Sequence, residues 1–385
     1  MTYDINRDEL MHVLQNLIRI NSVNPYLDED GPGERQIARY IAERLQASGL
    51  LVRFQPINDT AANVIGILNG TGGGKTLMLN GHMDTVSAKR MEIEPFEPRY
   101  ESGRVYGRGS LDMKGSLAAM IAAVEAVKRS EISLTGDVIL TFVADEEFKS
   151  IGTEELVKEY TADAAIVCEP TNLDIGVVHK GFAWIKCEVF GKSAHGSRPQ
   201  EGVDAIVRAG RVLREIERLC EQLGAKEHPI VGPPSVHASL IGGGTELSTY
   251  PDYCKLELER RTIPGETEAE VMAEMEAIMS RLSGEDEQFR ARYELFFLRE
   301  PFEVSTEEPV YRCLHQAISN RLQRPPKVAG FSGWADSALL QGAGIPTVLF
   351  GPVGEGLHAS SECVEFESLV DMAHVLAETI IDFCR

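Results

Sequence analysis

The spacing of hydrophobic positions changes from segment to segment along the chain, and it predicts which segments are helices and which are strands. Over residues 8–20, apolar residues recur every three or four positions, which is typical of a helix with one buried face. The same spacing over residues 34–45 predicts a second helix, with Gly49 just past its end. Compact apolar runs at residues 51–54, 63–68 and 76–80 predict strands.

Helices and strands continue to alternate further along, which is typical of the α/β class. A helix pattern over residues 113–129 precedes a wholly apolar strand at residues 138–143. After Pro301 the pattern returns, with a helix at residues 310–322, a strand at 347–350 and a final helix at 367–383. This order predicts a mixed, mostly parallel sheet flanked by helices.

The middle of the chain has a different pattern, beginning near Gly181. It predicts a strand at residues 183–190, a helix at 204–223, strands at 235–240 and 255–259, a helix at 268–282 and a strand at 292–297. This order predicts an α+β domain of the ferredoxin-like type. We therefore expect a discontinuous α/β domain at residues 1–180 and 297–385, interrupted by a smaller domain at residues 181–296.

Composition and charge limit the classes of partner. The formal charge of -21 over 385 residues argues against nucleic acid and anionic membranes, since both require basic surfaces. Seven scattered cysteines without a CxxC pair indicate reduced thiols. We see neither an export signal nor an apolar run long enough to span a membrane. These features predict a cytoplasmic protein.

The glycine-rich stretch at residues 71–76 (TGGGKT) is similar to a phosphate-binding loop and would suggest a nucleotide-dependent enzyme. However, position 69, where such a loop requires its first glycine, is Asn69. The stretch is also followed by a predicted strand, whereas a phosphate site needs a helix N-terminus. We therefore interpret it as a flexible hairpin between two strands.

The first candidate for chemistry is the motif His82-Met83-Asp84 at the end of a predicted strand. Residues two apart in a strand face the same side, so Asp84 can accept a hydrogen bond from one His82 nitrogen. The other nitrogen would then be directed at a metal ion. A His-x-Asp pair more often forms an ordinary hydrogen bond without a metal. The metal-binding interpretation of this motif therefore depends on the acids and histidines that follow it.

Two acidic segments come next. Asp112 lies in the glycine-flanked turn at residues 107–115 (GRGSLDMKG), where it either caps the next helix or bridges two cations. Asp145-Glu146-Glu147 follows the strand at residues 138–143, where acids are either solvated or form a site. Neighbours in an extended chain face opposite ways, so one acid can bind metal while the other stays free as a base.

Glu169 and His358 complete the series. Glu169 ends the apolar run at residues 165–168, and His358 lies in a glycine-containing loop after the strand at 347–350. Taken singly, each of these two residues is better explained by an ordinary structural role than by metal binding. Because four of the five candidate ligands follow apolar strands, we expect them at one edge of a single sheet.

These segments, taken in chain order, resemble the zinc metallopeptidases of family M20, the group of aminoacylase, acetylornithine deacetylase, succinyl-diaminopimelate desuccinylase and carboxypeptidase G2. The match covers essentially the whole chain. The resemblance implies two zinc ions, with cobalt or manganese as alternatives, held by His82, Asp112, Glu147, Glu169 and His358. Asp112 would bridge the ions, Glu146 would be the general base and Asp84 would orient His82.

The same resemblance assigns roles in the inserted segment, which would be a lid and dimerisation domain. His195, in GKSAHGS (191–197), would stabilise the developing oxyanion, often from the partner subunit of a homodimer. Arg261 would bind the substrate's carboxylate, a task suited to a bidentate donor. Gly333 and Trp334 would help to hold that carboxylate. Ser248 replaces an asparagine common in relatives.

The resemblance therefore implies an enzyme, a dinuclear zinc amidohydrolase that removes a small acyl group from an N-acyl amino acid or related amine. Acetylornithine deacetylase-like hydrolysis is the best single description. Neighbouring alternatives are a dipeptidase or carboxypeptidase acting on short peptides, a succinyl-diaminopimelate desuccinylase, and a deformylase acting on an N-formyl amide. A non-catalytic binding homologue would lack a ligand or the base, and all of them are present here.

Overall fold

The computed structural model describes residues 3–130 and 132–385, which form two compact units. Unit 1 contains the chain up to Val177 together with Val304–Ala329 and Ala335–Arg385. Unit 2 contains Val178–Glu303 and Gly330–Trp334. The segment that the sequence marks as inserted, residues 181–296, falls within unit 2. No helix among the described residues has the length and apolar character needed to cross a membrane.

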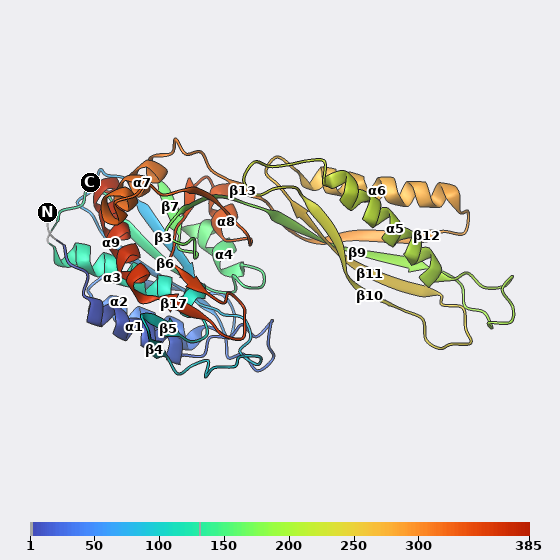
Figure 1. Ribbon diagram of the computed structural model, residues 1–385, viewed down its shortest axis with the longest axis horizontal. Helices are drawn as coiled ribbons and strands as arrows, with labels where there is room; N and C mark the ends of the chain where they lie inside the picture. Colours follow the sequence, from blue (N-terminus) through green and yellow to red (C-terminus); the bar gives the residue numbers. More distant parts are fainter. Residues whose placement is uncertain (1–2, 131) are drawn as a thin grey trace. The chain divides into compact units, whose positions relative to one another are not determined.

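A large mixed sheet lies mainly in unit 1 (Figure 1). Its strands are β1 (Leu51–Pro56), β2 (Ala62–Leu68), β3 (Leu77–His82), β6 (Val138–Val143), β7 (Ala164–Val167), β8 (Ile175–His179), β13 (Phe302–Glu303), β14 (Val328–Phe331) and β15 (Thr347–Leu349). The spatial order is β1-β2-β6-β3-β7-β15-β8-β13, with β14 also beside β8. The four neighbours β6, β3, β7 and β15 are parallel, whereas β1, β2, β8 and β13 pair antiparallel. The predicted α/β class with a mixed sheet is confirmed.

Helices cover the faces of this sheet. They are α1 (Arg7–Arg19), α2 (Arg35–Ala47), α3 (Gly115–Arg129), α4 (Ile151–Glu159), α7 (Pro309–Leu322), α8 (Ser337–Gly342) and α9 (Phe366–Phe383). Helix α3 is buried on nearly all sides because it packs against α1, α9 and β3. It begins at Gly115, directly after the irregular turn Ser110–Lys114 that contains Asp112.

A small second sheet connects two loops that are far apart in the sequence. It contains β4 (Arg99–Glu101), β5 (Arg104–Tyr106), β16 (Gly354–Glu355) and β17 (Cys363–Glu365). Strand β17 pairs antiparallel with β5, so Cys363 lies opposite Tyr106. Strands of two or three residues are too short to show a hydrophobic period, so they were not predicted from the sequence.

The interpretation of residues 71–76 as a hairpin was wrong. Strands β2 and β3 are not paired with one another, because β6 lies between them in the sheet. The stretch is instead a loop that crosses β6. Its Thr71 and Gly72 amides donate to the carbonyls of Leu134 and Thr135, at 2.9 Å each.

Unit 2 is a four-stranded antiparallel sheet with two helices on one face (Figure 1). Its elements are β9 (Gly181–Phe190), α5 (Ala205–Leu223), β10 (Ser235–Gly243), β11 (Tyr253–Thr262), α6 (Glu268–Glu285) and β12 (Arg290–Arg299). The spatial order β10-β11-β9-β12 is that of a ferredoxin-like domain. Alternate residues, such as Ala183, Ile185 and Leu258, face the helices and form a separate core.

Candidate metal centre

The carboxyl ends of three parallel strands meet at one edge of the unit 1 sheet, and chemically active residues follow each of them. His82 is the last residue of β3, which lies between β6 and β7. Glu146 and Glu147 follow β6, and Glu169 follows β7. Because the strands are parallel, these side chains reach the same edge, which is where open α/β sheets bind ligands.

The five predicted ligands lie together in two groups that share Asp112. In the first group, the Nε2 atom of His82 lies 3.1 Å from Asp112 Oδ1 and 3.6 Å from Glu169 Oε1. In the second, His358 Nε2 lies 3.2 Å from Asp112 Oδ2 and 3.1 Å from Glu147 Oε2. Within each group the ligand atoms lie within 4.8 Å of one another. The two carboxylate oxygens of Asp112 therefore face different histidines.

The acids of this cluster are packed closely enough to change one another's protonation. Burial first, and the Asp112 charge second, raise the pKa of Glu169 to about 8 and that of Glu147 to about 7. Burial also opposes ionisation of Asp112, but hydrogen bonds with His358 and His82 lower its pKa overall. The same contacts, first with Asp112 and then with Glu147, raise the pKa of His358 to about 10.

The donor set fits two divalent cations. Each group offers one imidazole nitrogen and two carboxylates, which are ligands suited to zinc, cobalt or manganese. The Oε1 atom of Glu147 is buried without a hydrogen-bond partner among the described residues. Two divalent cations would compensate the four neighbouring carboxylates of Asp112, Glu146, Glu147 and Glu169 and would satisfy that oxygen.

The orientation of His82 is set by its own strand end. Its Nδ1 lies 3.0 Å from the carbonyl oxygen of Asp84 and 3.5 Å from the Asp84 carboxylate. The nearer acceptor for His82 Nδ1 is thus the carbonyl oxygen of Asp84, and not the Asp84 carboxylate that was predicted from the sequence. The Asp84 carboxylate is already engaged, because it accepts hydrogen bonds from the amides of Glu146 and Glu147, at 3.1 Å each. Asp84 therefore positions the two glutamates as well as lying beside His82.

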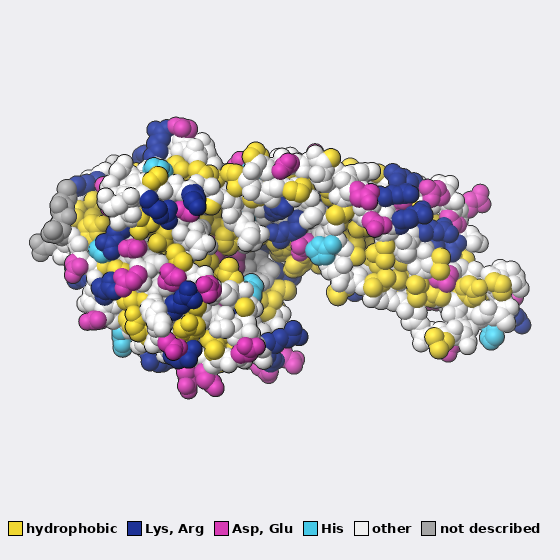
Figure 2. Space-filling view, viewed as in Figure 1, with side chains coloured by type: hydrophobic (Ala, Val, Ile, Leu, Met, Phe, Trp, Pro, Cys, Tyr) yellow, Lys and Arg dark blue, Asp and Glu magenta, His cyan; other side chains and the backbone are white. Residues whose placement is uncertain are grey.

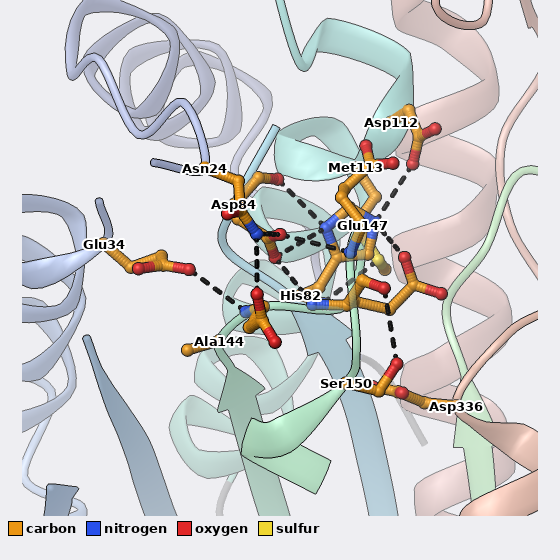
Figure 3. Close-up of polar contacts among 12 residues, drawn as sticks. Asn24, Glu34, His82, Asp84, Asp112, Met113, Ala144, Glu147, Ser150 and Asp336 are labelled. Carbon is orange, nitrogen blue, oxygen red and sulfur yellow. Dashed lines mark hydrogen bonds and ion pairs between the residues drawn. The ribbon is translucent and has the colours of Figure 1, made fainter. Parts of the chain in front are cut away.

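A buried polar network behind the cluster was not predicted (Figure 3). The Asn24 amide donates to Asp84 Oδ2 and to Asp145 Oδ1, at 2.9 Å each. Glu34 accepts a hydrogen bond of 3.0 Å from the Asp145 amide. Asp145 has a left-handed backbone with φ of 64°, so the acids lie in a turn and not in the extended segment expected from the sequence. Neither Asn24 nor Glu34 lies in a recognisable motif.

The turn that carries Asp112 is held by a second unpredicted residue, Glu362. Its carboxylate accepts hydrogen bonds from the amides of Gly109, Leu111 and Asp112, at 2.8 to 3.0 Å. It also pairs with the buried guanidinium of Arg108 at 2.9 Å. Arg108 in turn donates to the carbonyl of Ala359, next to His358. The peptide bond between Asp112 and Met113 is cis.

Glu146 belongs to neither ligand group but lies beside them. Its Oε2 atom is 3.9 Å from His82 Nε2. Burial raises the pKa of Glu146 well above its usual value, and the Glu169 charge adds to this while His82 opposes it. A buried carboxyl of this kind, next to possible metal ligands, has the properties of a general acid–base group.

The residues predicted to bind substrate all belong to unit 2. His195 is exposed, and its Nδ1 accepts a hydrogen bond of 3.2 Å from the Ser197 amide, which leaves the proton of a neutral ring on Nε2. Arg261 and Gly333 line a common cavity. Ser248 and Trp334 do not line this cavity: the Ser248 carbonyl accepts from the Gly196 amide, and Trp334 donates to the Glu300 carbonyl.

An α/β sheet with histidines and acids clustered at the carboxyl ends of its parallel strands is the kind of scaffold used by metal-dependent hydrolases. Comparison with known proteins identifies the group. Residues 78–382 match the model of peptidase family M20/M25/M40. The chain therefore belongs to this family, and it is a hydrolase that acts on amide bonds.

Individual relatives have different named activities. The chain is 30% identical to an acetylornithine deacetylase of Myxococcus xanthus, over 90% of this chain and 91% of the relative. It is 28% identical to the N-formyl-4-amino-5-aminomethyl-2-methylpyrimidine deformylase of Bacillus subtilis, over 98% and 95% respectively.

Solved structures share the fold over nearly the full length. A tripeptidase from Staphylococcus aureus superposes with a TM-score of 0.80 at 24% identity and covers 99% of both chains. A Bacillus subtilis protein described as a dinuclear metal-binding peptidase of the M20 family superposes with a TM-score of 0.77 at 16% identity, over 98% of both chains. Together with the two ligand groups, the family supports a metal centre for two ions.

Proposed function

We propose that this protein removes a small acyl group from an N-acyl amino acid or a related amine, in the manner of an acetylornithine deacetylase. The observation that carries the proposal is the position of Glu146 beside two ligand groups that share Asp112. This arrangement supplies a base that is not needed as a ligand. The named relatives that cleave acetyl and formyl amides support the small acyl group.

In this proposal, His82, Asp112 and Glu169 would hold one metal ion, and Asp112, Glu147 and His358 would hold the other. Two zinc ions, when bound, would polarise the scissile carbonyl and acidify the attacking water. Glu146 takes the proton of that water on its carboxylate and passes it to the departing nitrogen. Glu146 is free for this transfer because it lies beside the two ligand groups without belonging to either.

Unit 2 supplies the remaining groups, acting as a lid. His195 would donate from Nε2 to the developing oxyanion, because its Nδ1 is occupied as an acceptor. Arg261 would bind the substrate's carboxylate, with Gly333 beside it in the same cavity. A substrate-binding role for Ser248 and Trp334 is also proposed, and it rests only on the family resemblance.

We further propose a homodimer formed through unit 2. Strand β10 is an edge of the unit 2 sheet, and edge strands can pair with another chain. Leu240 and Ile241 on this strand are 61% and 60% exposed, and Ile206 and Val207 on α5 are also exposed. Figure 2 shows a band of hydrophobic side chains over the region of α5 and β10. A second copy of the chain would bury this surface.

A substrate panel on zinc-reconstituted protein tests the proposed reaction. The panel contains N-acetyl and N-succinyl amino acids, an N-formyl amide and dipeptides, and the release of free amine is measured. We expect turnover of N-acetyl amino acids. If only dipeptides were turned over, the chain would be a peptidase and not a deacylase. If only the formyl amide were turned over, the result would favour the activity named for the Bacillus subtilis relative.

A further inference from the structure

Unit 2 contains a cavity of about 600 Å³ on the face of its sheet that the two helices leave uncovered. Successive residues of a strand face opposite ways, so Val236 and Leu258 point to the helix-covered core while Ser235 and Arg261 point away from it. Ser235 lies directly opposite Arg261 in the β10–β11 ladder. The open face of the sheet therefore forms one wall of the cavity, and residues outside this sheet, among them Ile230, Val231 and Gly333, form the rest.

Arg261 brings hydrogen-bond donors to this cavity that lack acceptors. Its side chain is only 21% exposed, and its guanidinium lies over the Phe182 ring at 5.5 Å. Its nearest acid, Glu259, is 3.7 Å away, which is beyond hydrogen-bonding distance. No hydrogen bond of this guanidinium occurs among the described residues. Its guanidinium N–H groups are therefore available to donate to an acceptor on a ligand in the cavity.

Lys180 supplies a second cation to the same cavity. Its Nζ donates one hydrogen bond, of 2.5 Å, to the carbonyl of Pro233, and this contact fixes its position. Burial lowers the pKa of Lys180 below its usual value, and the charge of Arg261 lowers it further. Two mutually repelling cations beside one cavity are a site for an anion.

The rest of the lining is short of negative charge. Glu259 is the only acid among the described residues of the cavity wall. It already accepts a hydrogen bond of 3.1 Å from Trp184 and lies beside Arg261. The apolar part of the wall comes from Ile230, Val231 and Phe331. A positively charged group of a ligand would meet two cations here and no free acid.

We propose that Lys180 and Arg261 together bind the carboxylate of the substrate's amino-acid half, and that the apolar wall selects an uncharged side chain. This inference rests on the proposed function, in which unit 2 contacts the substrate. It assigns Lys180 a role in specificity and makes N-acyl amino acids with apolar side chains better substrates than N-acyl ornithine. It also requires a free carboxylate, which an N-acyl amino acid amide lacks.

Kinetics on the zinc-reconstituted full chain test this with N-acetyl-leucine, N-acetylornithine and N-acetyl-leucinamide. We expect kcat/KM for N-acetyl-leucine to exceed that for N-acetylornithine by about 10-fold or more, because the ornithine ammonium would be repelled by Lys180 and Arg261. Lys180→Met should lower kcat/KM for N-acetyl-leucine at least 10-fold more than for N-acetyl-leucinamide, mainly through KM. Lys186→Met is the matched control, because Lys186 lies on β9 outside the cavity and pairs with Glu294.

Equal losses for the leucine and leucinamide substrates would overturn the proposal, because they would make Lys180 a structural residue only. A preference for N-acetylornithine would overturn the assigned side-chain class. Calorimetric titration of zinc-loaded Glu146→Gln protein with N-acetyl-leucine separates binding from turnover. Binding to the Glu146→Gln protein that weakens about 10-fold or more when Lys180→Met is added would support this site. If the wild-type chain hydrolysed none of the three compounds, the same result would contradict the proposed function alone.

Discussion

At the scale of single residues, Glu146 and Glu147 are neighbours in the chain with different surroundings. Glu147 faces His358 at 3.1 Å and forms part of a ligand group, whereas Glu146 belongs to no group and lies near His82. The amides of both residues are held by the Asp84 carboxylate. Asp84 therefore determines which of the two acids faces which part of the cluster.

We expect Glu146→Gln to lower kcat by about 10²–10⁴-fold, the usual contribution of a general base. Metal stoichiometry, measured by elemental analysis, should not change, because the five ligands remain. Glu155→Gln is the control, since Glu155 is a half-exposed acid nearby that pairs with Lys158. A Glu146→Gln protein with most of its activity would refute the assignment of the base.

At the scale of elements, the clamp of Arg108 and Glu362 joins the turn before α3 to the loop after β16. The two residues are 254 positions apart, and both are nearly fully buried. Strands β5 and β17 pair alongside them and bring the two segments together. The clamp therefore holds Asp112 and His358 in a common arrangement.

Glu362→Ala should weaken zinc binding by about 10–100-fold, the range for residues that support metal ligands. It should also destabilise the chain by about 3–5 kcal/mol, because Arg108 would be left buried without a partner. Competitive chelator titration and urea unfolding measure the two effects. Glu355→Ala is the control, because Glu355 forms an exposed pair with Arg104 in the same sheet, worth at most about 1 kcal/mol. Equal metal affinity in both variants would contradict the role of the clamp.

At the scale of the whole molecule, the two units have separate cores, and the predicted ligands all lie in unit 1. Ligand binding stabilises only the part of the chain that must be folded to bind. We therefore expect zinc at 100 times its Kd to stabilise unit 1 by about 2.7 kcal/mol per site and to leave unit 2 unchanged. Calorimetry with and without chelator would show one shifted and one constant transition. A joint shift of all transitions would contradict independent units.

The proposed dimer gives a second prediction at this scale. Leu240→Asp combined with Ile241→Asp should convert the dimer to a monomer, because it introduces charges on the exposed edge strand β10. Light scattering coupled to size-exclusion chromatography measures the mass. Phe54→Asp is the control, since Phe54 is 51% exposed on β1, the edge strand of the other sheet. An unchanged mass in the double variant, or a monomeric wild type, would refute this interface.

The long elements could be predicted from the chain alone because hydrophobic spacing is a local property. Strand β6 begins and ends at the predicted residues, and α9 begins one residue before the predicted start. Most of the candidate ligands could be proposed in the same way, since His82 ends β3, Glu147 follows β6 and Glu169 follows β7. Short strands and the left-handed turn at Asp145 have no such local signal, and they were missed or misjudged.

Other features depended on which distant segments become neighbours. Strand β6 separates β2 from β3, Glu362 reaches the Asp112 turn, and Lys180 shares a cavity with Arg261. Sequence spacing records the period of a helix or strand because that period repeats every few residues. It does not record pairings between segments that lie many tens of residues apart, because these follow from packing the whole sheet. Packing also decides the partners of each buried polar group.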